Sequence, residues 1–417
     1  MPGNFNIDSA TFAAEFARFV TFLGTDELQS SLTKVDQKLR QLPGAVKMFY
    51  GDRYFFHEQC VKISEGDNPF QLDVTNFAAV RAANLIAGIN RAKSLLSAPA
   101  RGRLRAMCLD NLKPNRDVRQ LEHEIRCLAY FGLKGFEVSF ADLENEGRFD
   151  FICRPDTQSS FEVECKTVSE DTGSQIKIDM VAQLASVFQK SMLRKAATQE
   201  AGIFVIELRR PADQCKNLLS KTRDTLDGVS PSCEGVDFSF SFLPRPLWGD
   251  CISNGAWASF KQATLNAPEF KNCAHFVTKI GNRVFALAIR PHKESTLAER
   301  AVEVLKDAAD QCSKSRASML WLHFVGLAED HFLDIAQFSI DSRGGGLNAL
   351  VANALHPKAS STDRSHVNLV RFSGDAAYVE TKTVLDSNLL LAKAKSIGGA
   401  CYDVPNPNCK FPLGADF

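Results

Sequence analysis

The chain has 417 residues, 45% of them apolar, and its 49 basic side chains are balanced by 49 acidic ones. This composition is typical of a globular protein and excludes a disordered or fibrous one. The balanced charge excludes a uniformly basic protein but is compatible with a local basic groove. The longest apolar runs, such as residues 202–208, are far shorter than the roughly 20 residues that cross a bilayer. No secretory signal is visible at the start of the chain, so we expect a cytoplasmic protein without membrane contacts.

The twelve cysteines and eight histidines form no recognisable metal-binding pattern in the sequence. No two cysteines are separated by two residues, and no histidine pair has the spacing of a zinc-binding helix. Several cysteines lie inside apolar, periodic segments, where the thiol behaves as a small core side chain. We therefore expect free, buried cysteines, and the sequence gives little support to a zinc site.

Apolar residues recur at helical spacing over residues 1–105, and this pattern predicts a helical N-terminal region. From residue 117 the pattern changes to one helix, three short strands, a long helix and a strand. These six elements are expected at residues 117–132, 136–140, 148–154, 161–168, 174–199 and 202–208. Their order favours an α/β fold with a core domain at residues 106–210.

Residues 211–417 predict a connector followed by a mixed α/β region, which can pack as part of the core domain. Proline-containing turns over 209–260 indicate a loop-rich segment. A hairpin over 275–289, a helix over 297–314 and a buried strand over 318–327 are expected after it.

The segment from Asp150 to Lys166 contains the side chains best suited to chemistry. Side chains alternate along a strand, so Glu162, Glu164 and Lys166 share one face while the apolar residues between them point the other way. A neighbouring hairpin strand can bring Asp150 beside Glu164. We therefore expect two carboxylates and one ammonium group at one edge of a sheet. A solvated edge strand, which alternating charges often mark, is the competing interpretation.

This grouping suits metal-assisted hydrolysis of a phosphodiester. The carboxylates of Asp150 and Glu164 and the backbone carbonyl of Cys165 are hard oxygen ligands for Mg²⁺, and we expect Mn²⁺ to substitute for it. Glu162 or Glu124 is a candidate for a further carboxylate ligand. The lysine two residues beyond Glu164 is expected to orient or help deprotonate the attacking water and to stabilise charge on the phosphate.

Over residues 117–208 the chain resembles the PD-(D/E)XK nuclease superfamily. Asp150 matches the aspartate of the family motif, and Glu164 and Lys166 match its paired acid and lysine. The proline that often precedes the family aspartate is replaced here by Phe149. The resemblance implies a restriction-endonuclease-like αβββαβ core and catalysis by these three residues.

The same resemblance implies a metal-assisting glutamate on the helix that enters the core. Glu124 is the first candidate for this catalytic residue and Glu122 is the second. The acid-x-lysine triplet by itself is weak evidence, because three others begin at Asp36, Glu269 and Glu380. Only the triplet at residue 164 follows a strand aspartate within the full order of core elements.

A nuclease needs cationic side chains to hold a polyanion. Residues 91–120 carry eight basic side chains and two acidic ones, and we predict a phosphate-binding surface there, with further contacts after the acid-rich strand. The predicted nucleic-acid-binding residues are Arg101, Arg103, Arg105, Lys113, Arg116, Arg119, Gln175 and Lys177. A solvated helical face is an equally good interpretation of the basic residues.

The sequence thus predicts a Mg²⁺-dependent nuclease, with DNA favoured over RNA as the substrate, in defence, repair or toxin biology. A homodimer is compatible with this class of enzyme. One alternative is a catalytically inactive module with the same fold that binds nucleic acid or protein. Another is a scaffold protein whose main role lies in the C-terminal region.

Overall fold

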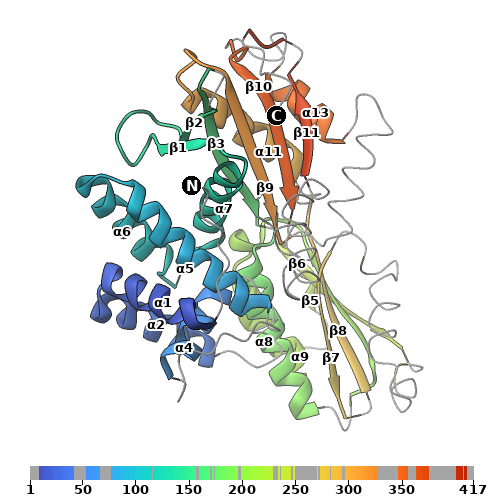
Figure 1. Ribbon diagram of the computed structural model, residues 1–417. Coiled ribbons are helices and arrows are strands. Elements are labelled where there is room, and N and C mark those ends of the chain that lie inside the picture. Colours follow the sequence, from blue (N-terminus) through green and yellow to red (C-terminus); the bar gives the residue numbers. More distant parts are fainter. Residues whose placement is uncertain are drawn as a thin grey trace. The chain divides into compact units, whose positions relative to one another are not determined.

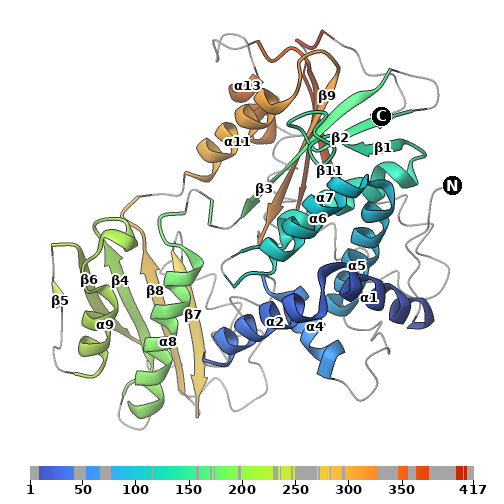
Figure 2. The same cartoon turned by 90° about the vertical axis from the view of Figure 1, so that its left-hand side faces the viewer.

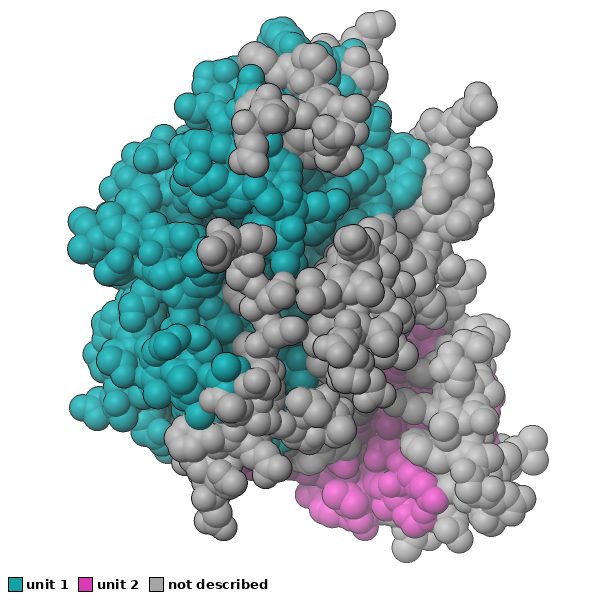
Figure 3. All heavy atoms as spheres, in the orientation of Figure 1, with its two compact units in different colours: residues 1–39, 51–172, 298–417 teal, residues 40–50, 173–297 magenta. Residues whose placement is uncertain are grey.

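Figure 1 shows a computed structural model of the chain. It describes residues 9–41, 53–65, 77–114, 116–155, 159–169, 171–172, 174–195, 199–228, 233–234, 236–245, 248, 270, 273–281, 283–293, 296–326, 346–355, 363–374, 401–406 and 408–410. Two compact units are distinguished, and Figure 3 colours them teal and magenta. The first comprises residues 1–39, 51–172 and 298–417, and the second comprises residues 40–50 and 173–297. Both contain helices and a mixed sheet, so the chain is an α/β protein, as the sequence predicts.

Helices form the N-terminal part of the first unit. They are α1 (Ser9–Leu23), α2 (Thr25–Arg40), α4 (Phe55–Glu65), α5 (Phe77–Leu95) and α6 (Ala98–Asn111). Apolar spacing explains them, since α1 buries Phe12, Phe16 and Phe19 along one face. α6 begins after Ser97, whose hydroxyl accepts a hydrogen bond from the backbone amide of Ala100. The described parts of residues 1–105 thus form helices, as their apolar spacing predicts.

The sheet of the first unit has six strands in the order β1–β2–β3–β9–β10–β11. Their bounds are Glu137–Phe140, Phe151–Arg154, Phe161–Ser169, Ser318–Val325, Val367–Gly374 and Cys401–Pro405. β1, β2 and β3 are antiparallel neighbours. β9 runs parallel to β3, β10 runs parallel to β9, and β11 closes the order as an antiparallel partner of β10.

Helix α7 (Arg119–Leu133) packs on one face of this sheet (Figure 2). Phe161, Val163 and Cys165 of β3 point toward α7 and join it in one hydrophobic cluster, together with Trp321 of β9. The ring of Phe131 on α7 makes edge contacts with the rings of Phe161 and Trp321. Phe161, Val163 and Cys165 therefore form the apolar face of β3.

The even-numbered residues of β3 point to the opposite face, where α11 (Leu297–Gln311) lies. The carboxylate of Glu162 on that face accepts a hydrogen bond from the backbone amide of Ser313, just after α11. α13 (Gly346–Leu355) contacts β10 and β11. β3 thus separates an apolar face under α7 from a face that carries acids.

The second unit has a five-stranded sheet in the order β5–β6–β4–β8–β7. The strands span Cys233–Glu234, Phe238–Pro244, Gly202–Leu208, Arg283–Arg290 and Ala274–Ile280 in that order. β4 and β8 are parallel, and the remaining pairs are antiparallel. The helices of this unit are α8 (Ile178–Lys195), the short η2 (Ala212–Gln214) and α9 (Leu218–Leu226).

The six elements expected over residues 117–208 form in the expected chain order, but they do not share one sheet. α8 and β4 belong to the second unit, so the division into units differs from the predicted domains at 1–105, 106–210 and 211–417. The crossover that returns to β3 is formed by α11 and β9. Both helix–strand pairs have the same apolar periodicity, so local pattern does not reveal which of them pairs with β3.

Two further expectations concern cysteines and membranes. The cysteines whose side chains the structure describes are free, and most are buried, as predicted. Within the described part of the chain, no helix has both the length and the apolar character that a bilayer crossing requires.

Candidate active site

Asp150 and Glu164 lie on neighbouring segments of the antiparallel pair β2–β3. The register pairs Phe151 with Val163, so its continuation places Asp150 opposite Glu164. The backbone amide of Cys165 donates a hydrogen bond of 2.6 Å to Oδ2 of Asp150. This bond holds the Asp150 carboxylate against β3, beside the glutamate.

Lys166 extends this group along β3. Its ammonium forms an ion pair with Oε1 of Glu164, whose side chain is 1% exposed, whereas 25% of the Lys166 side chain is exposed. The other carboxylate oxygen, Oε2 of Glu164, is buried and has no hydrogen-bond partner among the described residues. A buried carboxylate oxygen without a donor is unfavourable, and a cation bound there would relieve that cost.

Helix α7 carries a third carboxylate, that of Glu124, which interacts electrostatically with Asp150, Glu164 and Lys166. The side-chain amide of Gln120 is 3.4 Å from Oε1 of Glu124. Burial raises the pKa of Glu124 well above its ordinary value, and the negative charges of Asp150 and Asp142 raise it further. The four predicted catalytic side chains therefore lie within electrostatic range of one another, and their catalytic roles stay predictions. We call Glu124, Asp150, Glu164 and Lys166 the acidic centre.

Burial and mutual repulsion raise the pKa values of the carboxyls in the acidic centre. Burial raises the pKa of Glu164 to about 7; the charge of Glu124 adds to this rise, and contact with Lys166 opposes it. Burial and the charge of Glu164 raise the pKa of Asp150 well above its ordinary value. Burial lowers the pKa of Lys166, but the negative charges of Glu164, Asp150 and Glu124 outweigh this effect, so that the pKa is raised.

The donor set fits Mg²⁺, the ion that the sequence pattern implies. The three carboxylates are hard oxygen ligands, and their excess negative charge lies in a poorly solvated place where a divalent cation compensates it. The predicted contribution of the Cys165 backbone carbonyl stays a prediction.

A fourth acid, Asp142, adjoins the acidic centre and is missed by the sequence analysis. It lies in the turn after β1, where Oδ1 accepts a 2.6 Å hydrogen bond from the Leu143 amide. Burial raises the pKa of Asp142, and its charge raises those of Glu124 and Asp150. The expected hairpin between β1 and β2 was the sequence feature that could have indicated Asp142. The Ala141 amide donates a hydrogen bond of 2.9 Å to the Asp150 carbonyl, and this contact places Asp142 near the site.

Glu162 does not join the acidic centre, although it shares a strand face with Glu164. Its side chain is 0% exposed, and its carboxylate accepts hydrogen bonds from the amide of Ser313, at 2.7 Å, and from the hydroxyl of the same residue. Arg316 lies 3.4 Å from Oε1. These partners occupy its oxygens, so the structure corrects the expectation that Glu162 is a metal ligand.

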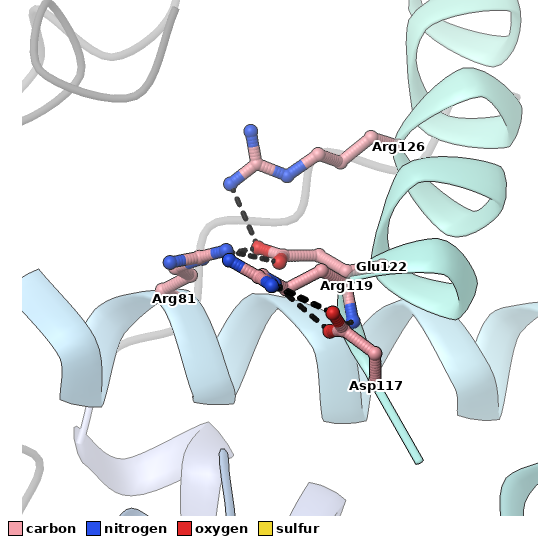
Figure 4. A network of polar contacts seen from close by, with 5 residues as sticks. All are labelled: Arg81, Asp117, Arg119, Glu122 and Arg126. Carbon is pink, nitrogen blue, oxygen red and sulfur yellow. Dashed lines mark hydrogen bonds and ion pairs between the residues drawn. The ribbon is translucent and has the colours of Figure 1, made fainter. Parts of the chain in front are cut away.

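Figure 4 shows why Glu122, the second candidate on α7, has a structural role. Nε and Nη2 of Arg81 on α5 each donate to its carboxylate at 2.6 Å, and Arg126 donates at 3.0 Å. The side chains of Arg81 and Glu122 are 5% and 3% exposed. This buried, bidentate ion pair links α7 to α5, and Glu124 is therefore the functional candidate.

Most of the basic residues predicted to bind phosphate are engaged within the chain. Arg119 is buried and contacts Asp117 at 2.6 Å (Figure 4). The other ion pairs join Arg105 to Glu27, and both Lys113 and Arg116 to Asp110. The side chains of Lys113 and Arg116 are nevertheless 64% and 60% exposed, and the phosphate-binding surface along α6 and the start of α7 stays a prediction.

Arg101 and Arg103 on α6 bind backbone carbonyls. Nε of Arg101 donates to the carbonyl of Leu96 at 2.9 Å, and Nε of Arg103 donates to that of Leu143 at 2.7 Å. The charge of Arg103 partly opposes the rise in the pKa of Asp142. Arg103 therefore lies beside Asp142, and its predicted contact with phosphate stays a prediction.

Gln175 and Lys177 lie in the second unit, on the segment before α8. Lys177 is exposed and Gln175 is half-buried. Their predicted contacts with nucleic acid stay predictions.

Comparison of the chain with protein-family models, with curated proteins and with solved structures gives no significant match. The fold and the acidic centre are therefore the basis for assigning a function.

Proposed function

We propose that this protein is a Mg²⁺-dependent nuclease whose active site is the acidic centre, with DNA favoured over RNA as the substrate. The observation that carries the proposal is the grouping of three carboxylates and one lysine, in which Glu164 is buried and the other three side chains are half-buried. Oε2 of Glu164 has no donor in the described part of the chain. Structural carboxylates are normally paired with donors, as those of Glu122 and Glu162 are.

The topology around the acidic centre supports a restriction-endonuclease-like core. α7 leads into the antiparallel strands β1, β2 and β3, and α11 then leads into β9, which lies parallel beside β3. This order agrees with the αβββαβ core that the sequence resemblance implies, once residues 173–297 are taken as an insertion between β3 and α11. The acids lie on β3 and just before β2, as the resemblance requires.

Each side chain of the centre has a role that follows from its chemistry. Asp150, Glu164 and Glu124 hold the cation through their carboxylate oxygens. An ion held there would supply a more acidic water ligand and would neutralise charge on the scissile phosphate. Lys166 has a raised pKa and is protonated at neutral pH, so it orients the attacking water and stabilises charge on the phosphate. Mn²⁺ replaces Mg²⁺ because both ions accept oxygen ligands.

A cleavage assay tests the proposal with plasmid DNA, single-stranded DNA and RNA, each in Mg²⁺, Mn²⁺ or EDTA. We expect cutting only with a metal, and more of DNA than of RNA. Glu164→Gln and Lys166→Met should each lower the rate by at least about 100-fold. Glu137→Gln is the matched control, because this glutamate lies on β1 of the same sheet with its side chain 76% exposed.

Other outcomes are equally informative. Binding without cleavage in any metal would replace the enzyme with a nucleic-acid-binding module of the same fold. Cleavage that survives EDTA, or that a folded Glu164→Gln variant retains, would contradict the assignment of the active site. Preferential cutting of RNA would overturn the favoured substrate and leave the site intact.

A further inference from the structure

A second cluster of metal-ligating side chains lies on the opposite face of β3, beneath α7. His123 and Cys127 are one turn apart on α7, and Cys165 faces them from β3. A ligand atom from each lies within 4.8 Å of the other two, and all three side chains are buried. The closest approach between His123 and Cys127 is 3.8 Å, from Nδ1 to Sγ.

His123 also makes the outer contact that orients a metal-binding histidine. Nε2 lies 3.1 Å from the carbonyl oxygen of Trp321. A carbonyl only accepts hydrogen bonds, so the ring proton is on Nε2 and the lone pair of Nδ1 is left for the cluster. The ring stacks on that of His323 with centroids 5.0 Å apart, which fixes its plane.

We propose that His123, Cys127 and Cys165 form a Zn²⁺ site between α7 and β3. Zinc binds thiolate sulfur at about 2.3 Å and imidazole nitrogen at about 2.0 Å in tetrahedral geometry, so its ligand atoms lie roughly 3.5–3.8 Å apart. The three side chains need only small movements to reach that separation. Binding releases the two thiol protons to solvent, and two thiolates then balance the charge of the ion.

The ligand chemistry separates this cluster from the acidic centre. Two sulfurs and an imidazole favour zinc over Mg²⁺, which takes oxygen ligands. The spacing of cysteines and histidines in the sequence gives a zinc site little support, because zinc sites are predicted from ligand pairs with regular spacing. Here one pair lies on a helix and the third ligand comes from a strand that only the fold brings beside it.

The proposed zinc ion joins the two elements that supply the acidic centre. α7 carries Glu124, and Cys165 lies between Glu164 and Lys166, whose side chains point to the other face of β3. An ion between α7 and β3 therefore fixes the distance between these carboxylates. This consequence rests on the proposed nuclease function, whereas the zinc site itself does not.

Titration of the reduced, metal-free chain with Co²⁺ tests the site directly. Thiolate ligands give Co²⁺ a charge-transfer absorption in the near ultraviolet that carboxylates do not give. We expect one equivalent of Co²⁺ to produce this absorption and Zn²⁺ to abolish it by displacement. Cys127→Ser and Cys165→Ser should each reduce the absorption by half or more and weaken zinc binding by at least about tenfold. Cys108→Ser, in a buried thiol of α6 from the same hydrophobic cluster, should change neither.

The Co²⁺ spectrum of the wild-type chain tests the zinc site even if a variant fails to fold. Absence of thiolate absorption in the folded wild-type chain overturns the zinc site. So does zinc binding that persists unchanged in a folded variant with both Cys127 and Cys165 replaced by serine. These readouts do not involve cleavage, so failure of the zinc site and failure of the nuclease function are distinguishable.

Discussion

The backbone amide of Cys165 donates a 2.6 Å hydrogen bond to Oδ2 of Asp150. Asp150 lies just before β2 (Phe151–Arg154) and not within it, so strand pairing alone does not fix its side chain. The bond directs the carboxylate toward β3, where Glu164 and Lys166 lie. A single contact between neighbouring segments thus helps to assemble the acidic centre.

Asp150→Asn tests whether the charge or the hydrogen bond of this residue matters for activity. The amide oxygen of asparagine can still accept from Cys165, but the negative charge is lost. We expect the rate of DNA cleavage to fall by at least about 100-fold, with a free energy of unfolding equal to or above that of the wild type, because a buried and repelled carboxylate is removed. Asp150→Ala also loses the hydrogen bond and should be less stable than Asp150→Asn by about 1–3 kcal/mol in urea denaturation. Wild-type cleavage by Asp150→Asn would contradict the role of the charge.

Glu122 and Glu124 are neighbours on α7 with opposite expected behaviour. Glu122→Ala removes the carboxylate that pairs with the buried guanidinium of Arg81, and we expect a loss of about 3–5 kcal/mol in the free energy of unfolding. Glu124→Gln should keep or raise the stability, because it removes a poorly solvated carboxyl whose pKa is already raised, and should abolish cleavage. Denaturation and the cleavage rate per folded molecule separate the two effects. A large destabilisation by Glu124→Gln with normal cleavage would reverse the assignment.

The raised pKa of Glu164 predicts how Mg²⁺ stabilisation depends on pH. This pKa is about 7 in the folded chain, against about 4.3 for an unperturbed glutamate. Between these values the folded state retains a proton that the unfolded state has released, so the metal-free protein loses stability as pH rises through this range. Mg²⁺ takes the place of the proton, and we expect it to raise the melting temperature more at about pH 8 than at about pH 5.

Thermal unfolding with and without Mg²⁺ at the two pH values measures this difference. Glu164→Gln, which has no proton to exchange, should lose most of the pH dependence and most of the stabilisation by metal. Equal stabilisation of the wild type at both pH values would show that the ion binds away from Glu164.

Asp142→Asn tests the acid that the sequence analysis missed. Removal of its charge should lower the pKa values of Glu124 and Asp150, because repulsion from Asp142 raises both. The site also loses attraction for a cation, and we expect Mn²⁺ affinity measured by calorimetry to weaken by about tenfold. Glu146→Gln, in an exposed residue of the same turn, is the control and should leave the affinity unchanged. An unaltered affinity in Asp142→Asn would mean that this acid acts only on the local fold.

Local geometry made much of the acidic centre predictable. The two-residue period of β3 places Glu164 and Lys166 on one face of the strand, whatever surrounds it. The short hairpin places Asp150 opposite Glu164. The sequence alone does not separate the roles of Glu124 and Glu122, because the difference depends on Arg81, which lies on another helix.

Contacts between distant segments were not predictable. Arg105 was a candidate for phosphate binding because its neighbours in sequence are basic, yet its carboxylate partner, Glu27, is 78 residues away. The pairing of β3 with β9 depends likewise on which apolar helix and strand pack best in three dimensions. Apolar periodicity indicates that an element is buried, but it does not indicate which other element packs against it.

Binding of a divalent cation by the acidic centre is tested most directly by locating Mn²⁺ in crystals of the wild-type protein from its anomalous scattering. We expect a peak that lies about 2.1–2.2 Å from carboxylate oxygens of both Asp150 and Glu164, and no peak there in Glu164→Gln crystals. Mn²⁺ bound only elsewhere, with Glu164 still paired to Lys166 and no ion beside it, would contradict the proposed active site.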